Sequence, residues 1–411
     1  MTIQFQDHAS IDGFEIIDGE LCLCGEAISV ITDRVGQTPL YLYSRALIEQ
    51  RIKFLRDTLP AALELHYAIK ANPMPELVSM VGQLVDGLDV ASSGEIDVAL
   101  AAGVDPATIS FAGPGKSDAE LAHAIAADIT LNVESEGELD RIVGLAGEGS
   151  QMPKVALRVN PAFELRQSGM KMGGGAKPFG IDEELVPDIL TRLAGLPVEF
   201  VGFHIFAGSQ GLDEDVLIDC HQKTIDLAIS LIAQAHCPVS HINIGGGYGI
   251  PYFPGDKPLP LDRLSACLEA CLAKLEKASP GTRMILELGR YIVGEAGLYV
   301  ARILDRKVSR GEVFFVTDGG LHHHLALSGN FGQVIRKNYP LMIANRSGGD
   351  LVPATIVGRL CTPLDRMGDR VNIPADTQVG DLVVIFQSGA YGATASPMAF
   401  LGHGPAAEIL V

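Results

Sequence analysis

Lys70 is the residue of this sequence whose position points most directly to chemistry. It ends a segment, residues 63–70, in which apolar and polar side chains alternate, and residues 71–73, which end in proline, interrupt the alternation. Such alternation predicts a β-strand with one apolar and one polar face. If helices cover the apolar face, the lysine lies at the carboxyl end of the strand, where barrel enzymes place their reactive groups. Its amine is therefore a candidate for forming a Schiff base.

The other strand-like segments also end in reactive or small residues. These residues are Asp89, Ser92, Gly113, Glu134, Arg158, Asn160, His204, Gly245, Gly246, Gly247, Glu287 and Arg290. The consecutive glycines would expose backbone N–H groups that hold a phosphate, and Arg290 would add a bidentate donor for an anion. A lysine that forms a Schiff base, a phosphate cradle and a carboxylate together describe a site for pyridoxal phosphate.

The elements that carry these residues predict a parallel barrel. Strand-like and helix-like segments alternate, which favours an α/β fold, a (β/α)8 TIM barrel over residues 35–295. The expected strands are 63–70, 87–92, 108–114, 129–135, 154–161, 200–207, 241–247 and 284–290. Short alternating segments separated by turn residues follow residue 296 and also occupy the N-terminus. Residues 1–34 and 296–411 are therefore expected to form a discontinuous all-β domain, a β-sandwich or β-barrel.

The composition favours a cytoplasmic enzyme. The chain has 411 residues, of which 47% are hydrophobic, so it can bury a large core. Its net charge of −19 and the lack of a basic stripe argue against nucleic-acid binding. We expect no secretory signal and no membrane span. Seven cysteines, an odd number spread over a long chain, fit free thiols in a reducing compartment.

Several segments resemble the fold-type III pyridoxal phosphate-dependent decarboxylases, the group of the ornithine, diaminopimelate and arginine decarboxylases. The similar segments are 67–72, 88–95, 245–249 and 287–290, with Cys361 and Tyr391 downstream, and they follow one another in the family's order along nearly the whole chain. The resemblance implies an alanine racemase-like barrel followed by a β-domain, pyridoxal 5'-phosphate as the cofactor, and a homodimer whose active sites are completed across the interface.

The resemblance also implies a role for each matching residue. Lys70 would hold the cofactor as a Schiff base, His204 would lie over the ring face, and Glu287 would bond the pyridine nitrogen. A carboxylate there deepens the electron sink for the electrons left when CO₂ departs, which favours a carboxy-lyase over a racemase. Cys361 would return a proton to Cα in the site of the other subunit. The remaining cofactor-binding residues would be Asp89, Arg158, Ser209, Gly245, Gly246, Gly247, Arg290 and Tyr391.

Two departures from the family pattern bear on the substrate. Diaminopimelate and ornithine decarboxylases place an acidic residue directly after the cysteine to hold the distal amine, whereas this chain has Thr362. The segment 204–209 is two residues longer than the family's His-x-Gly-Ser, and the loop 164–177 is long and rich in glycine. These features resemble the branch that decarboxylates aminoacyl groups tethered to carrier proteins, such as the glutamyl-carrier-protein decarboxylase of butirosin biosynthesis and its relatives in polysaccharide and exosortase gene clusters.

The loop 164–177 is a candidate receptor for an acidic carrier protein. It carries Arg166, Lys171 and Lys177 against Glu164 alone, on a chain that is otherwise strongly acidic. We therefore expect it to receive the carrier or its phosphopantetheine arm, while an ordinary solvated active-site lid is an equal alternative.

Other functions stay open beside this hypothesis. A free amino-acid decarboxylase of the diaminopimelate type and an amino-acid racemase of the alanine-racemase type share the barrel and the lysine. A small pyridoxal phosphate-binding homeostasis protein is the non-enzymatic alternative, and the β-domain and Cys361 count against it. We expect no metal site at His322-His323-His324, because consecutive side chains on an extended chain point to opposite faces.

Overall fold

The computed structural model describes residues 3, 5, 8–146, 151–164, 170–171, 173–328 and 337–411. The chain divides into two compact units. The first, here called the barrel unit, comprises residues 51–249 and 259–289. The second, the β unit, comprises residues 1–50, 250–258 and 290–411.

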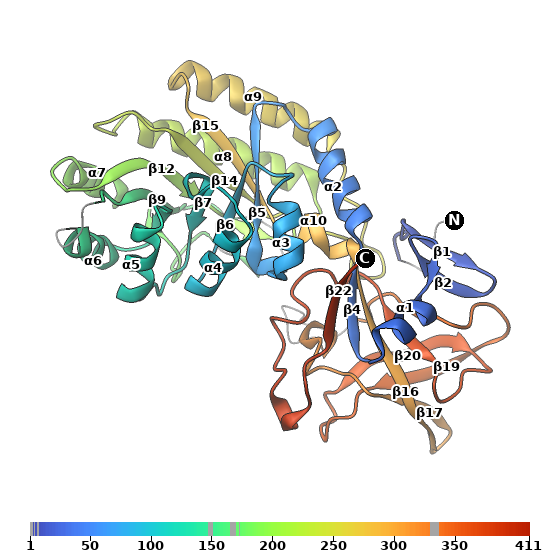
Figure 1. Cartoon of the computed structure of the whole chain (residues 1–411). Helices are drawn as coiled ribbons and strands as arrows, with labels where there is room; N and C mark the ends of the chain where they lie inside the picture. The colour runs from blue at the N-terminus through green and yellow to red at the C-terminus, as the bar shows by residue number, and fades with distance from the viewer. Residues whose placement is uncertain are drawn as a thin grey trace. The chain divides into compact units, whose positions relative to one another are not determined.

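Eight parallel strands of the described chain form the closed barrel (Figure 1), which confirms the predicted TIM barrel. They are β5 (Leu63–Ala68), β6 (Gly87–Val90), β7 (Ile109–Phe111), β8 (Thr130–Val133), β9 (Lys154–Asn160), β12 (Glu199–Ile205), β14 (His241–Gly246) and β15 (Arg283–Leu288). β15 pairs with β5, and the pairing of β8 with β9 completes the ring. Each strand overlaps one of the eight expected from the sequence. The short strand β11 (Ile181–Asp182) adds to β9 from outside the ring.

Helices cover the outside of the barrel strands (Figure 1). They are α2 (Arg45–Thr58), α3 (Pro75–Val81), α4 (Ser93–Ala101), α5 (Asp118–Ala126), α6 (Glu136–Ala146), α7 (Val186–Leu193), α8 (Glu214–Ile232) and α9 (Asp262–Ala278). Side chains at the strand-to-helix turns fix several of their starts. Ser92 accepts a hydrogen bond from the backbone N–H of Glu95, and Ser117 and Glu120 form a capping box. These caps set the direction in which the chain leaves the rim of the barrel.

Lys70 lies just beyond its strand rather than within it. β5 ends at Ala68, and Ile69–Ala71 form a single 3₁₀ turn, closed by a 2.9 Å hydrogen bond from the N–H of Asn72 to the carbonyl of Ile69. The expected strand over 63–70 is therefore two residues too long. The apolar and polar alternation continues into the turn, so periodicity alone could not place the boundary.

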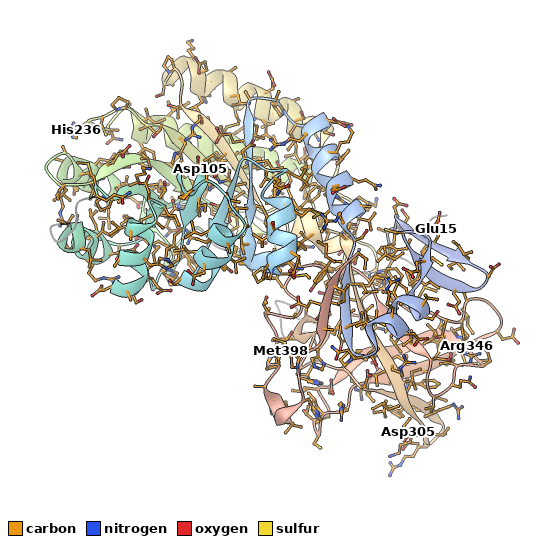
Figure 2. The ribbon with its side chains drawn as sticks, viewed as in Figure 1. Glu15, Asp105, His236, Asp305, Arg346 and Met398 are labelled. Atoms are coloured by element: carbon orange, nitrogen blue, oxygen red, sulfur yellow. The ribbon has the colours of Figure 1, made fainter. Side chains whose placement is uncertain are left out.

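The β unit is built on a mixed sheet. Its strands are β4 (Leu40–Tyr43), β16 (Gly297–Ser309), β17 (Glu312–Thr317), β18 (Leu341–Ile343), β19 (Leu351–Val357), β20 (Arg366–Pro374), β21 (Leu382–Ile385) and β22 (Ala407–Leu410). Most neighbours are antiparallel, whereas β17 with β19 and β4 with β22 are parallel. The outer half of β16 is exposed, and Figure 2 labels Asp305 there.

The N-terminal segment belongs to this unit because its apolar side chains share the core of the sheet. β1 (Phe14–Ile17), β2 (Glu20–Leu23) and β3 (Glu26–Ala27) form a separate small sheet, followed by α1 (Ile28–Val35). The buried side chains of Phe14, Leu21, Leu40, Leu298 and Phe386 lie in one hydrophobic cluster. β4, which the sequence placed with the barrel, pairs with β16 and β22 instead.

No helix in the described part of the chain combines the length and the apolar character that crossing a membrane requires.

Candidate active site

The centre of the candidate site is a buried carboxylate between a lysine and a histidine. Oε1 of Glu287 lies 3.4 Å from Nζ of Lys70, and its Oε2 lies 3.3 Å from Nε2 of His204. Glu287 comes from β15, His204 from β12 and Lys70 from the turn after β5. Glu287 and His204 are buried, whereas the side chain of Lys70 is 44% exposed. The lysine amine is therefore accessible above a carboxylate that is screened from water.

The electrostatics of the centre keep Glu287 ionised. Burial alone would raise the pKa of this carboxyl, but Lys70, His204 and Arg158 outweigh it and hold the pKa well below its usual range. The ring of Phe206 lies 5.7 Å, centroid to Nζ, from the lysine. The site thus offers a permanent buried anion next to an amine.

The three glycines at the end of β14 lie against backbone atoms of neighbouring strands. A Cβ on Gly246 would come within 2.2 Å of the carbonyl of Glu287, and one on Gly247 within 2.1 Å of the carbonyl of Gly208. Gly245 and Gly247 also have positive φ angles of 65° and 74°. Ser209, in the short strand β13 (Gly208–Ser209), is next to Gly247. Only glycine fits at these positions, so the turn is built for close approach of the backbone.

Asp89 is held by hydrogen bonds to buried polar side chains inside the barrel. Its Oδ1 accepts a hydrogen bond from the hydroxyl of Ser110, which accepts one in turn from Nδ2 of Asn132 at 3.1 Å. Nδ1 of His66 lies 3.5 Å from Oδ2 of Asp89. All four side chains are buried. The network fixes the orientation of a carboxylate one strand away from Lys70.

Arg158 is engaged by a buried carboxylate. Its Nη1 donates to Oε1 of Glu134 at 2.7 Å, and its guanidinium carbon lies 5.2 Å from the ring centroid of Phe179. Glu134 also accepts hydrogen bonds from the N–H groups of Gly113 and Gly180. Burial would raise the pKa of Glu134, but Arg158 and its other donors lower it. Glu134, paired with Arg158, therefore ties two loops of the barrel rim together.

Arg290 and Tyr391 belong to the β unit and contact each other there. The guanidinium carbon of Arg290 lies 4.6 Å from the ring centroid of Tyr391 and 5.2 Å from that of Tyr252, whose hydroxyl accepts a 2.7 Å hydrogen bond from Nη1. Nε of Arg290 is buried and has no hydrogen-bond partner among the described residues. The arginine is thus held by aromatic rings with a donor left for an anion.

The loop that carries Cys361 is also in the β unit. Cys361 is exposed and Thr362 is half-buried. The only nearby acid in the sequence, Asp365, points inward, where its two oxygens accept hydrogen bonds from the N–H groups of Leu321 and Leu360 at 2.7 and 2.8 Å. Asp365 therefore shapes the loop and does not face solvent beside the cysteine.

Comparisons with known proteins place this arrangement in a family. The model of the pyridoxal-binding domain of the pyridoxal-dependent decarboxylases matches residues 45–294. The chain is also 37% identical to L-glutamyl-[BtrI acyl-carrier protein] decarboxylase from Niallia circulans, over 93% of this chain and 90% of that protein. The chain belongs to the pyridoxal-dependent decarboxylases.

Two further relatives agree with this family. The chain is 33% identical to a diaminopimelate decarboxylase from Aquifex aeolicus, over 97% of this chain and 92% of that protein. The crystal structure of a diaminopimelate decarboxylase from M. jannaschii superposes with a TM-score of 0.88 at 26% identity, over 97% of this chain and 92% of that one. The family predicted from the sequence motifs is therefore confirmed, together with the decarboxylase class.

In this decarboxylase the basic loop is described only in part. Arg166 and the side chain of Lys171 lie outside the described residues, whereas Lys177 is described and half-buried. The backbone of residues 170–171 forms β10 (Met170–Lys171), which pairs with β13, so Lys171 lies opposite Gly208. This places the middle of the loop beside the segment that carries Ser209.

The three consecutive histidines of the decarboxylase do not lie on an extended chain, which corrects the reason given for rejecting a metal. They lie in a turn, where the rings of His322 and His323 are 3.8 Å apart. Nε2 of His323 contacts the carbonyl of Gly404 at 2.8 Å, and Nε2 of His324 contacts the hydroxyl of Ser388 at 3.0 Å. Two of the rings thus bind groups of the fold itself.

Several residues of the site were not singled out from the sequence. These residues are Phe206, His66 and Ser110. A signal for His66 was present, because it shares the polar face of its strand with Lys70. The sequence carries no such signal for Ser110, because its partner Asp89 is more than twenty residues away. It carries none for Phe206 either, because the position of that ring depends on a loop conformation.

Proposed function

We propose that this chain is a pyridoxal phosphate-dependent α-decarboxylase whose substrate is an aminoacyl group tethered to a carrier protein. The observation that carries the cofactor role is the buried carboxylate of Glu287 between Lys70 and His204. The substrate is inferred from the relative of Niallia circulans, whose name specifies a glutamyl group on an acyl-carrier protein.

The residues at this centre fit pyridoxal phosphate. Lys70 offers an accessible amine for the Schiff base, and Glu287 offers a buried anion for the pyridine nitrogen. The glycines 245–247 leave no room for a side chain, because a Cβ on any of them would meet another atom within 2.4 Å. Such a turn lets a phosphate approach backbone N–H groups, and the hydroxyl of Ser209 is adjacent.

Some side chains of the site would hold the cofactor, and others would transfer protons. Bound pyridoxal phosphate would supply the electron sink for the electrons left at Cα when CO₂ departs. Glu287, kept ionised by its lowered pKa, would hold a proton on the pyridine nitrogen. His204 would restrict the orientation of the ring from one face, and Cys361 would deliver the proton to Cα. Asp89 and Arg158 would position the rim, while Arg290 and Tyr391 would contribute to phosphate binding.

The loop at Cys361 supports a substrate without a free distal amine. Thr362 stands where diaminopimelate and ornithine decarboxylases carry an acid, and Asp365 is occupied by two backbone N–H groups. A distal ammonium group would therefore find no carboxylate on this loop. An aminoacyl group attached through its distal end to a carrier carries no such charge.

The cofactor assignment is tested by Lys70→Ala. We expect the wild-type protein to be yellow and its absorbance to shift on borohydride reduction, and we expect the variant to lack the visible band. Lys223→Ala, an exposed lysine of α8 paired with Asp219 at 2.6 Å, serves as the control. A Lys70→Ala protein that keeps the band would refute the assignment.

The substrate is tested by CO₂ release from a panel. Free diamino and acidic amino acids are compared with the same amino acids loaded on an acyl-carrier protein. We expect release from the loaded carrier. Release from free diaminopimelate alone would instead favour the second candidate, a diaminopimelate-type decarboxylase, which the relative of Aquifex aeolicus supports.

A shared site in a homodimer is part of the proposal. If Cys361 acts on the cofactor held by Lys70 of a second subunit, an inactive Lys70→Ala protein mixed with an inactive Cys361→Ala protein regains activity. Random exchange of subunits would restore one intact site in the mixed dimer. Failure to recover activity after subunit exchange has been verified would argue for a site within one chain.

The loop 164–177 stays a candidate receptor for the carrier. Charge reversal of Arg166, Lys171 and Lys177 together should raise KM for the loaded carrier, because carrier proteins are acidic and attraction between opposite charges speeds encounter. An unchanged KM would leave this loop as an ordinary lid.

A further inference from the structure

The β unit contains a groove that the candidate catalytic residues do not occupy. Its volume is about 810 Å³, within the range of roughly 300–1,000 Å³ in which proteins bind ligands of drug size. A free amino acid fills only a small part of such a space. The groove lies beside the first residues of β18, β19 and β20, and its lining includes Pro254, Tyr339, Leu341, Leu351, Pro363 and Leu364.

The loop of Cys361 forms one wall of this groove. Pro363 and Leu364 line it, two and three residues after the cysteine. The loop is fixed from inside by Asp365, through the N–H groups of Leu321 and Leu360. A ligand in the groove would therefore lie along the same loop that presents the thiol of Cys361.

The groove exposes two large apolar side chains. Leu364 is 60% exposed and Leu351 is 58% exposed, and both belong to the lining. Large apolar side chains gathered around a concave surface mark binding sites more often than ordinary surface does. They suit the apolar part of a ligand that lies along the groove.

The charges of the lining favour an anion at one end. Among the described residues of the lining, Lys337 and Arg366 are accompanied by one acid, Asp369, on a chain whose net charge is −19. Arg366 pairs with Asp369 at 2.9 Å, but an exposed pair of this kind contributes only about 0–1 kcal/mol. A guanidinium has five N–H donors, so it can bind a phosphate while keeping this partner.

Asn338 stiffens the floor of the groove. Its Nδ2 donates to the carbonyl of Asp369 at 2.7 Å, and its Oδ1 accepts from the N–H of Asp369 at 2.9 Å. These two hydrogen bonds hold Asn338, three residues before β18, against β20. The groove therefore exists before a ligand arrives, which lowers the entropic cost of binding.

We propose that this groove binds the phosphopantetheine arm of the carrier protein, which rests on the carrier-tethered substrate proposed above. The arm is a long, flexible chain with a phosphate at one end, a dimethyl-substituted segment next to it, two amides and the thioester that holds the aminoacyl group. Arg366 and Lys337 match the phosphate, and Leu351, Leu364 and Leu341 match the dimethyl segment. The thioester end would then lie along the loop that presents the thiol of Cys361, the proposed proton donor.

The test compares groove variants with matched variants of the same unit. Leu364→Asp and Arg366→Gln alter the groove. Leu304→Asp, at a leucine that is 48% exposed on β16, and Arg370→Gln, at an arginine paired with Glu312 at 3.1 Å, are the controls. The two substrates are a glutamyl-loaded acyl-carrier protein and the glutamyl thioester of N-acetylcysteamine, which lacks the phosphate and the dimethyl segment.

We expect each groove variant to raise KM for the loaded carrier at least tenfold and to change kcat/KM for the short thioester less than twofold. Free 4'-phosphopantetheine, measured by calorimetry, should bind the holoenzyme and the control variants but bind the groove variants at least tenfold more weakly. Unchanged KM in the groove variants, with an active wild-type enzyme, would overturn the groove assignment alone. A wild-type enzyme that ignores the loaded carrier would overturn the proposed substrate itself.

A second copy of the chain is the other occupant that the experiment detects. If Leu364→Asp turns a dimer into a monomer in analytical ultracentrifugation and lowers activity on both substrates equally, the groove is a subunit interface and the proposal is wrong.

Discussion

Nζ of Lys70 lies 3.4 Å from Oε1 of Glu287, although 217 residues separate the two in the sequence. The contact arises because β15, which carries Glu287, is the parallel neighbour of β5, whose end leads into Lys70. Closing the barrel therefore creates the pair. A carboxylate so close to an amine and shielded from water is the feature on which the proposed chemistry depends.

Replacing Glu287 by glutamine tests the role of its negative charge at nearly constant side-chain size. Glu287→Gln keeps the volume but removes the anion, so we expect kcat to fall by roughly 10²–10³-fold, as for the loss of one aligned electrostatic partner. The absorbance of the bound cofactor should become more dependent on pH, because the pyridine nitrogen loses its proton more easily. Steady-state kinetics and a spectroscopic titration check both expectations.

The matched control for Glu287 is Glu64→Gln on β5. Glu64 receives two 3.1 Å contacts from Nη1 of Arg283 at the opposite end of the strand. We expect this variant to keep kcat within twofold. Equal losses in both variants would mean that the effect of Glu287 is structural.

Gly247 should be more sensitive to alanine than another glycine of the same unit. Gly247 has φ +74° and Gly281 has φ +82°. Alanine at either position would therefore lose about 1 kcal/mol of stability from the left-handed backbone conformation. A Cβ at Gly247 would also meet the carbonyl of Gly208 at 2.1 Å, whereas one at Gly281 meets nothing within 4 Å. Gly247→Ala should therefore weaken cofactor binding at least tenfold, and Gly281→Ala should leave it unchanged, by fluorescence titration. Equal affinities would exclude a role of this turn in binding.

A buried ion pair away from the reactive centre should control the stability of the barrel. Nζ of Lys116 lies 2.6 Å from Oε1 of Glu138, and both side chains are at most 2% exposed. Burial lowers the pKa of Lys116 and raises that of Glu138, although each is supported by the other. Lys116→Met should lower the free energy of unfolding by roughly 3–5 kcal/mol, because it strands a buried carboxylate.

The double variant tests the cause of that loss. Lys116→Met combined with Glu138→Leu should be more stable than Lys116→Met alone, since no charge is left buried. Lys116 also donates to the carbonyls of Gly113 and Asn132, so recovery should be incomplete. Urea unfolding of the wild type, the single variant and the double variant measures the three free energies of unfolding. A double variant less stable than the single one would contradict the charge argument.

His221 should make the protein less stable as the pH falls from 6.5 to 4. Burial in α8 lowers its pKa to about 4, so the unfolded chain binds a proton over this range and the folded protein does not. The contribution is intact above pH 6.5 and reaches a loss of about 3 kcal/mol near pH 4. His221→Asn should reduce the slope of unfolding free energy against pH by about one proton.

The control for His221 is His236→Asn. His236 lies exposed on the barrel unit (Figure 2), so its removal should leave the slope unchanged. The midpoints of urea unfolding at several pH values between 7 and 4 provide the measurement. Identical slopes for the wild type and both variants would show that His221 is accessible to protons in the folded protein.

The sequence by itself determined the order and type of the elements and the residues at the strand ends. Alternation with period two reveals a strand locally, and the residue that follows it is known without knowing the neighbours. For this reason the eight barrel strands, and the positions of Lys70, His204 and Glu287 at or near the ends of three of them, could be predicted from the sequence. The boundary at Ala68 was missed because the alternation runs on into the 3₁₀ turn.

Only the tertiary structure decided which of these residues meet and which acids are available. The pairing of β4 with β16, the bond from Ser110 to Asp89 and the contact of Arg158 with Glu134 each join residues far apart in the chain. Asp365 follows Cys361 closely enough to look accessible, yet its carboxylate is buried against backbone N–H groups. Burial and long-range pairing depend on how the whole chain closes on itself, and no local pattern of side chains encodes them.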